Sequence, residues 1–413
     1  MKKLLLLFPC VLITAALFPQ EIRIDELKKH ITYLSSDELQ GRRTSSEGEK
    51  KSALYIQQQF RMAHLQPKGT QGYIFEFSFK KNPDPHDTIT VNLPERKGIN
   101  VVGFLNNEVE YTVIIGAHHD HLGLGNDKNS LDANSEGKIH NGADDNASGV
   151  AGVIELANYF SNNNRKEKFN FLFICFSGEE LGLIGSKKFC ENPTIDFSKV
   201  NYMLNMDMIG RLSDSTKKLV IYGVGTSPDF VPLIDNLQTE LSIKKDSAGI
   251  GPSDQTSFYL KNIPVLHFFT GQHSDYHKPG DDVEKINFNG EKQVLELIIR
   301  VIEETEQLPK LVFTPTKNSE ETKTAFKVTL GIMPDYIFEG KGVRADGVTD
   351  GKPAGKAGLK PGDIIIQLGE FSVSNMQDYM KALSSFNKGD STKVKVLREN
   401  KEVTMEVLFN NNK

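Results

Sequence analysis

Five short segments of the sequence place side chains that can bind a metal directly after an apolar run. Imidazoles and carboxylates together form a donor set that suits zinc, whereas calcium and magnesium prefer oxygen alone. Adjacent carboxylates beside apolar residues repel one another and resist burial unless a cation neutralises them. Each cluster alone is weak evidence, but five of them predict a metal site. The segments are residues 116–121, 142–149, 177–180, 205–207 and 275–277.

The apolar runs that precede these clusters have the length of buried strands, and they alternate with helical patterns. This alternation predicts an α/β fold over residues 21–308, a three-layer α/β/α domain with a mixed, largely parallel sheet. In open sheets of this kind, sites form just past the carboxyl ends of the strands, where the clusters fall. The expected strands are 99–105, 112–117, 169–177, 200–207, 218–222 and 263–269, and the expected helices lie within 22–65, 150–160, 228–241 and 292–304.

The ends of the chain differ from this central part. Lys2 and Lys3 precede an apolar run from 4 to 18, which predicts a signal peptide over residues 1–20. The run is shorter than the ~20 residues of a membrane-spanning helix, so we expect cleavage, export to the periplasm or the outside, and no stable transmembrane span. Residues 309–325 have a linker composition, and 326–413 are long enough for a small β-rich domain.

Composition excludes two classes of protein. The net charge of -5 leaves no broad basic surface, so we expect no nucleic-acid partner. With 3 cysteines in 413 residues, a disulfide framework is excluded as well.

In this order the five motifs resemble those of metallopeptidase family 28, the co-catalytic di-zinc aminopeptidase family, over residues 25–305. The resemblance implies a zinc exopeptidase that holds two Zn²⁺ ions and releases N-terminal amino acids from peptide substrates. Matched by position, the expected ligands are His118 and Asp207 for one ion, Glu180 and His277 for the other, and Asp145 between both.

Three further roles follow from the same resemblance. Glu179 matches the general base that moves a proton from water to the leaving amine. Asp120 matches the carboxylate that fixes the imidazole of His118. Tyr276 matches a tyrosine that steadies the oxyanion.

Several neighbours of these residues have no matched role. We interpret most of them as lining or support of the cleft: His119, His121, Asp144, His267, His273 and Asp275. The roles of Asp254 and Arg211 stay open. The Gly/Asn/Asp-rich segment 122–140 is typical of a mobile loop at the cleft rim, where Asp127 and Asp132 could form a calcium site.

Residues 326–413 resemble a bacterial PDZ domain, on the strength of segments 330–333 and 357–365. The resemblance implies that a peptide or protein C-terminus adds as a strand, starting within residues 329–334. Pro334 departs from the pattern, because proline removes a donor from the strand ladder. The alternative is a packing module that binds no peptide.

Other functions remain open for the catalytic part. The same scaffold serves exopeptidases of the carboxypeptidase or dipeptidase type and glutaminyl cyclases, which typically keep one zinc. A catalytically dead peptide-binding protein would be expected to lack Glu179 or a metal ligand. Neither is lost here.

Overall fold

The computed structural model describes residues 21–80, 93–127, 129–132, 134–316, 328–335, 338, 340–349 and 351–409. The expected signal peptide and most of the expected linker lie outside these ranges. No helix within them is long and apolar enough to cross a bilayer.

Nine strands of the described residues form a mixed sheet in the order β1-β3-β5-β4-β6-β9-β7-β8, with β2 paired to β3. The pairs β5–β4, β4–β6 and β6–β9 are parallel, whereas β3 and β7 run antiparallel to their inner neighbours. The bounds are β1 (Gln66–Pro67), β2 (Ile74–Phe79), β3 (Arg96–Leu105), β4 (Thr112–His118), β5 (Asn170–Phe176), β6 (Val200–Met206), β7 (Lys218–Tyr222), β8 (Ser242–Asp246) and β9 (Val265–Phe269).

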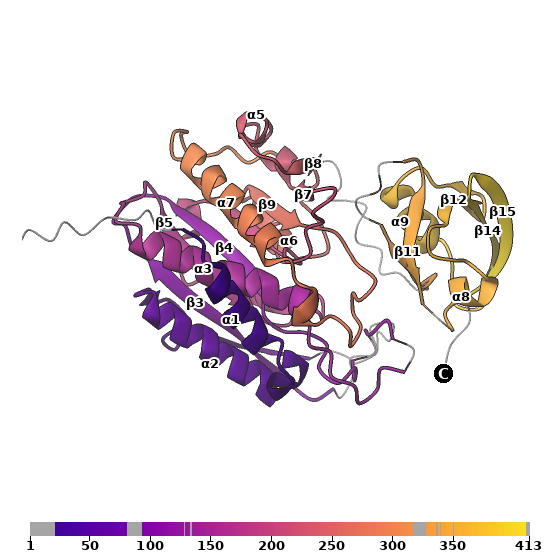
Figure 1. Cartoon of the computed structure of the whole chain (residues 1–413), viewed down its shortest axis with the longest axis horizontal. Coiled ribbons are helices and arrows are strands. Elements are labelled where there is room, and N and C mark those ends of the chain that lie inside the picture. The colour runs from indigo at the N-terminus through magenta and orange to yellow at the C-terminus, as the bar shows by residue number, and fades with distance from the viewer. Residues whose placement is uncertain are drawn as a thin grey trace, which may run out of the picture.

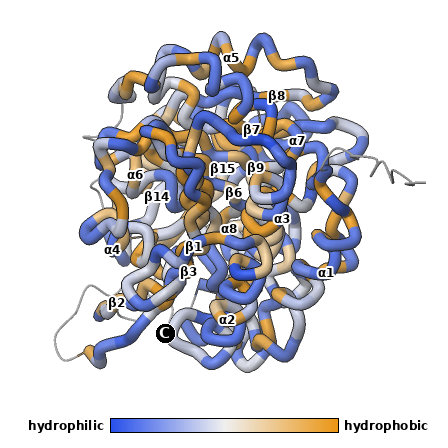
Figure 2. The backbone as a smooth tube through the Cα atoms, turned by 90° about the vertical axis from the view of Figure 1, so that its left-hand side faces the viewer, coloured by the Kyte–Doolittle hydropathy of each residue, from blue (hydrophilic) through white to orange (hydrophobic). Residues whose placement is uncertain are grey.

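The three central strands are buried along their whole length. β4, β5 and β6 show no exposed position, and their sequences are nearly continuous apolar runs. Parallel strands need this pattern, because both faces of the sheet are covered. In Figure 2, hydrophobic residues gather near the centre of the view, and many of the outer turns are hydrophilic.

Helices cover both faces of this sheet, and each face has its own apolar core. One core joins the sheet to α1 (Ile24–Leu34), α2 (Glu47–Met62), α3 (Gly149–Asn162), α5 (Phe230–Asn236) and α7 (Phe288–Thr305). The other joins it to α4 (Ile184–Glu191) and α6 (Gln255–Tyr259). The predicted three-layer α/β/α architecture is therefore confirmed (Figure 1).

The C-terminal residues form a second sheet with a core of its own, which includes Leu330, Ile365 and Val396. Its order is β10-β11-β12-β14-β15, with β13 paired to β12. The register of β10 against β11 shifts between Met333 and Pro334, where the sequence predicted a disturbed ladder. The elements are β10 (Ile332–Pro334), β11 (Val343–Val348), α8 (Pro353–Ala357), β12 (Ile364–Leu368), β13 (Phe371–Ser372), α9 (Met376–Ser384), β14 (Ser391–Arg398) and β15 (Lys401–Leu408).

Candidate metal centre

The carboxyl ends of β4 and β6 bring a first set of three donor atoms together. His118 is the last residue of β4, and Asp207 directly follows β6. His118 Nε2 lies 3.3 Å from Asp145 Oδ1 and 3.4 Å from Asp207 Oδ1. Asp145 comes from the short helical turn η2 (Ala143–Ser148) that leads into α3.

A second set uses the other oxygen of the same aspartate. His277 Nε2 lies 3.2 Å from Asp145 Oδ2 and 3.1 Å from Glu180 Oε2. Glu180 follows β5, and His277 lies in the loop after β9. Asp145 therefore presents one carboxylate oxygen to each set.

These spacings fit zinc. Ligands about 2.0–2.1 Å from a tetrahedral ion lie about 3.3 Å from one another, close to the 3.1–3.4 Å separations in both sets. Asp145 Oδ2 is buried and has no hydrogen-bond donor among the described residues. An unpaired carboxylate oxygen between imidazoles is a site that a cation would satisfy.

The charges of the ligands depend strongly on one another. Burial alone would raise the pKa of Asp145, but His121, His118 and His277 hold it well below its usual value. Burial alone would lower the pKa of His277, but Glu180 and Asp145 raise it well above the usual value. Without a metal, protons on imidazole compensate the carboxylates, and a bound cation would replace those protons.

Each imidazole is held so that Nε2 faces its set. His118 Nδ1 lies 3.1 Å from the backbone carbonyl of Asp120 and 3.7 Å from its carboxylate. The Asp120 carboxylate accepts from Thr44 Oγ1 (2.8 Å) and from the backbone N–H of Glu179 (3.2 Å). The backbone of Asp120, more closely than its side chain, therefore fixes the His118 ring.

His277 is held by segment 122–140, which the sequence suggested was a mobile rim. Its Nδ1 lies 3.0 Å from the carbonyl of Asn129, and its own carbonyl accepts from Ser130 Oγ and from the backbone N–H of Leu131. This part of the segment is a support of the second set. The composition of the segment carried no signal for these contacts, because each joins residues that lie far apart in the sequence.

Glu179 and Tyr276 border the two sets. Glu179 Oε2 lies 4.0 Å from His118 Nε2, and its side chain is 11% exposed. Burial raises the pKa of Glu179 well above its usual value, and neighbouring Glu180 and Asp207 raise it further against the opposing effect of His118. The Tyr276 ring stacks on His277 with 3.9 Å between ring centres.

The surplus residues of the motifs divide into two groups. His119 and Asp144 are buried structural residues: His119 lies against Ser52 and the Ile99 carbonyl, and Asp144 accepts from Gly210 N and Ser148 Oγ. His121 points into the second set, with Nδ1 2.8 Å from Glu180 Oε1. Its place in the first motif was the only signal in the sequence.

The two residues whose roles were left open, and the two of the calcium hypothesis, are also placed. Asp254 is fully buried, and burial raises its pKa to about 7. Arg211 lies 3.2 Å from Asp275, so it pairs with a carboxylate of the protein. The calcium hypothesis is not supported, because Asp127 is bound by Arg43 and Asp132 lies 3.0 Å from Lys138.

Two supports of the site escaped the sequence analysis altogether. Asp281 Oδ2 accepts from the backbone N–H groups of Asp144 and Asp145, both at 3.0 Å. Ser253 Oγ donates to Asp207 Oδ2 at 2.8 Å. Both residues act on ligands that are distant in the sequence, so no local spacing reveals them.

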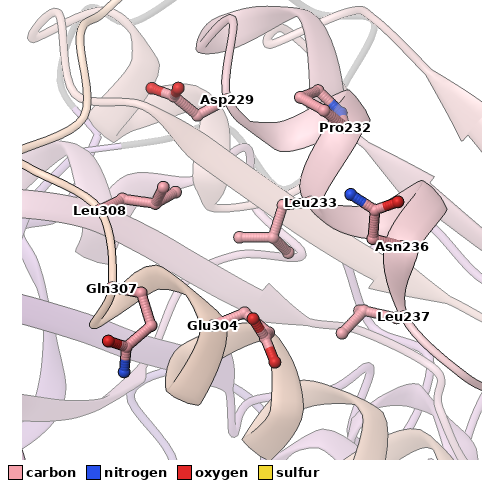
Figure 3. A pocket seen from close by; sticks show the side chains of 8 residues that line it. All are labelled: Asp229, Pro232, Leu233, Asn236, Leu237, Glu304, Gln307 and Leu308. Carbon is pink, nitrogen blue, oxygen red and sulfur yellow. The ribbon is translucent and has the colours of Figure 1, made fainter.

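A separate hollow between α5 and the end of α7 contains none of these residues (Figure 3). It is lined by Asp229, Pro232, Leu233, Asn236, Leu237, Glu304, Gln307 and Leu308. Its mixed lining brings no set of metal-binding or nucleophilic groups together.

Comparison with known proteins identifies the class to which both parts belong. Residues 100–302 match the model of peptidase family M28, and residues 313–408 match that of the PDZ domain. The chain therefore matches an M28 peptidase in its central part and a PDZ domain in its C-terminal part.

The curated relatives include aminopeptidases, as the match to a peptidase family leads one to expect. The chain is 24% identical over 227 residues to a probable leucine aminopeptidase of Arthroderma otae. The aligned region covers 52% of this chain and 59% of that protein. It thus spans less than two thirds of the length of this curated relative.

Two solved structures share the fold. An aminopeptidase from Aneurinibacillus sp. strain AM-1 matches with a TM-score of 0.52 and 18% identity, over 72% of this chain and 97% of its own. A glutaminyl cyclase from Porphyromonas gingivalis matches with a TM-score of 0.55 and 15% identity, over 70% of this chain and 100% of its own. At these identities the likeness concerns the fold alone.

Proposed function

We propose that this protein is a metallo-aminopeptidase that holds two zinc ions and releases N-terminal amino acids from peptides. One observation carries the proposal: the two oxygens of Asp145 each complete a separate donor set with metal-like spacing. His118 and Asp207 would hold one ion, and Glu180 and His277 the other. The aminopeptidases among the relatives support the reaction class.

The proposed chemistry divides between the ions and the side chains. Bound zinc lowers the pKa of a water to about 7 and polarises the scissile carbonyl. Glu179 lies beside the first set with a raised pKa, so its carboxylate can take a proton from water and pass it to the leaving amine. Tyr276, stacked on His277, would donate to the carbonyl oxygen as that oxygen gains charge.

The preference for an N-terminus would come from two carboxylates on the accessible side of the site. Glu179 and Asp207 are 11% and 14% exposed, whereas Asp145 and Glu180 are 4% and 5% exposed. A free α-amine next to the scissile carbonyl is a cation that both accessible carboxylates attract. An acetylated N-terminus has no such charge.

Two further parts of the proposal concern the ends of the chain. We propose that the protein is exported by the apolar segment 1–20, which lies outside the described residues. We also propose that the PDZ domain binds peptide or protein C-termini along β10, since strand addition is the mode that PDZ domains use.

The test compares matched peptides with free and acetylated N-termini and identifies the products. The proposal requires release of single amino acids from the free peptide and none from the acetylated one. Equal rates on both would indicate an endopeptidase or a carboxypeptidase. Ammonia and a cyclised N-terminus from a glutaminyl peptide would indicate the cyclase that the Porphyromonas gingivalis structure makes the second candidate.

A further inference from the structure

His121 occupies a buried position under the second donor set. It comes three residues after His118, and its side chain is 0% exposed. Its Nδ1 lies 2.8 Å from Glu180 Oε1 and 3.8 Å from Asp145 Oδ2. Its ring meets the ring of His277 edge to face, with 5.9 Å between centres.

Two roles are compatible with this position, and the distances separate them. A ligand of the second ion would lie about 3.3 Å from the other ligand atoms, as His277 Nε2 does from Asp145 and Glu180. His121 instead approaches the opposite oxygen of Glu180, at the length of a charge-assisted hydrogen bond. His121, Asp145 and Glu180 lie close enough to one another to hold a metal, but 2.8 Å is shorter than the tetrahedral spacing of ligand atoms and fits a proton shared between Nδ1 and Oε1.

We propose that His121 is a positioning residue that donates its Nδ1–H to Glu180 Oε1 and thereby holds Glu180 Oε2 towards the second metal position. The proposal rests on the two-zinc site proposed above and adds the residue that orients one of its ligands. It assigns the proton to Nδ1 and leaves Nε2 without one.

The surroundings of the ring agree with this tautomer. His121 Nε2 is buried and has no hydrogen-bond partner among the described residues. A proton there would be a buried donor without an acceptor, which costs about 1–3 kcal/mol. With the proton on Nδ1 instead, Nε2 is an acceptor without a donor, so the 2.8 Å contact decides the tautomer: a proton on Nδ1 satisfies Glu180 Oε1, whereas a bare Nδ1 would place its lone pair against those of the carboxylate.

The backbone around His121 leaves room for the ring. A β-carbon on Gly142 would lie 2.5 Å from His121 Cδ2, so the absence of a side chain there makes room for the imidazole. The backbone N–H of His121 donates to the carbonyl of Arg42 at 3.3 Å. Gly142 lies three residues before Asp145, so the segment that carries the bridging aspartate also seats His121.

If His121 has this role, its loss should change the affinity for one ion and not for the other. Loss of a partner that orients a metal ligand typically lowers metal affinity about 10–100-fold. The first set has its own supports in Asp120 and Ser253, and neither of them contacts Glu180 by a hydrogen bond in the described structure. Removing the His121 donor should therefore lower the affinity for the second ion and leave the affinity for the first ion unchanged.

The experiment is a two-site zinc competition titration of the full-length protein against a coloured chelator. His121→Leu fills the space without a donor, whereas His121→Asn keeps an N–H near the position of Nδ1. The leucine variant should bind one zinc ion about 10–100-fold more weakly than wild type, and the asparagine variant should have an affinity within about threefold of wild type. If the leucine variant does not fold by circular dichroism, His121→Ala carries the same expectation.

His30→Leu is the matched control. His30 is another fully buried histidine; its ring contacts Tyr55, Glu26 and Glu155, none of which belongs to either donor set. Its loss should lower stability and leave both zinc affinities unchanged.

Two results would overturn the role of His121. Unchanged affinities in the leucine variant would make the residue a packing residue. Loss of one ion in the asparagine variant, as complete as in leucine, would make His121 a ligand. Fewer than two ions on the wild-type protein would instead contradict the proposed function, whatever the variants do.

Discussion

Outside the two donor sets, substitution of Arg42 should cause the largest loss of stability. Its guanidinium is buried and donates to backbone carbonyls alone: His119 (2.9 Å), Gly142 (3.0 Å), Asn141 (2.6 Å) and Leu34. It thereby ties His119, the residue directly after His118 and β4, to the segment that leads to Asp145. Burial lowers the pKa of Arg42 to about 10, so the side chain is still charged at neutral pH.

The change Arg42→Met keeps an apolar stem and removes every donor. The carbonyl of Gly142 keeps a second donor, the backbone N–H of Ala147 at 3.2 Å. The other three carbonyls lose their bond to Arg42, at about 1–3 kcal/mol each when a buried group is left unsatisfied. Carbonyls tolerate this better than N–H groups, so we take the lower part of the range and expect a loss of about 3–5 kcal/mol.

The assay is urea unfolding followed by far-ultraviolet circular dichroism, because the chain has no tryptophan to serve as a fluorescent probe. With a slope of about 3 kcal/mol per M, the expected loss moves the midpoint of the catalytic domain by about 1–2 M. Arg61→Met, at an exposed position of α2, is the matched control and should move it little. Zinc affinity of Arg42→Met should fall as well.

Arg42→Lys tests whether charge or geometry matters. Lysine keeps the cation but has three donors on one atom, which cannot span carbonyls on several segments. We expect it to recover less than half of the lost stability. If the free energy of unfolding of Arg42→Met lay within about 1 kcal/mol of wild type, the reasoning would be refuted, because water or a rearrangement would then satisfy the carbonyls.

Three further predictions concern catalysis. Glu179→Gln should keep both metals and lower kcat about 100-fold or more with little change in KM; wild-type turnover would show that Glu179 is not the base. Chelation should abolish activity and added zinc should restore it, with elemental analysis finding two ions per chain; a metal-free, fully active protein would contradict the mechanism. Deletion of residues 326–413 should spare a short aminoacyl reporter and reduce activity on longer peptides, because a second contact raises the effective concentration at the site. If a folded, zinc-loaded truncation lost both activities equally, the PDZ domain would instead be part of the active site.

The strands that the sequence revealed are those whose burial on both faces produces a continuous apolar run. β4, β5 and β6 are buried on both faces, so each is a recognisable apolar run. β8 escaped because its sequence, Ser-Ile-Lys-Lys-Asp, is mostly polar at the end of the sheet. β2 was missed although its burial alternates from Phe75 to Phe79, which is the period-two pattern of a strand with one covered face.

The donor sets show a similar limit. The five motifs contain every residue of the two donor sets described above, because strand ends bring short clusters together. They did not determine which way neighbouring side chains point: His119 turns into the protein towards Ser52, whereas His121 turns to Glu180. Such directions depend on how each loop leaves its strand, and that is set by partners such as Arg42 that lie far away in sequence.

The order of the ligands along the chain has a consequence for biosynthesis. The first set is complete once Asp207 has been made, and its strands β4 and β6 are neighbours in the sheet. The second set needs His277, which arrives only after β7, β8 and β9. A chain that emerges N-terminus first therefore has all three donors of the first set about 70 residues before it has those of the second. Catalysis that requires both ions would then be withheld until nearly all of the peptidase domain has been made, which keeps the growing polypeptide from acting before its fold is closed.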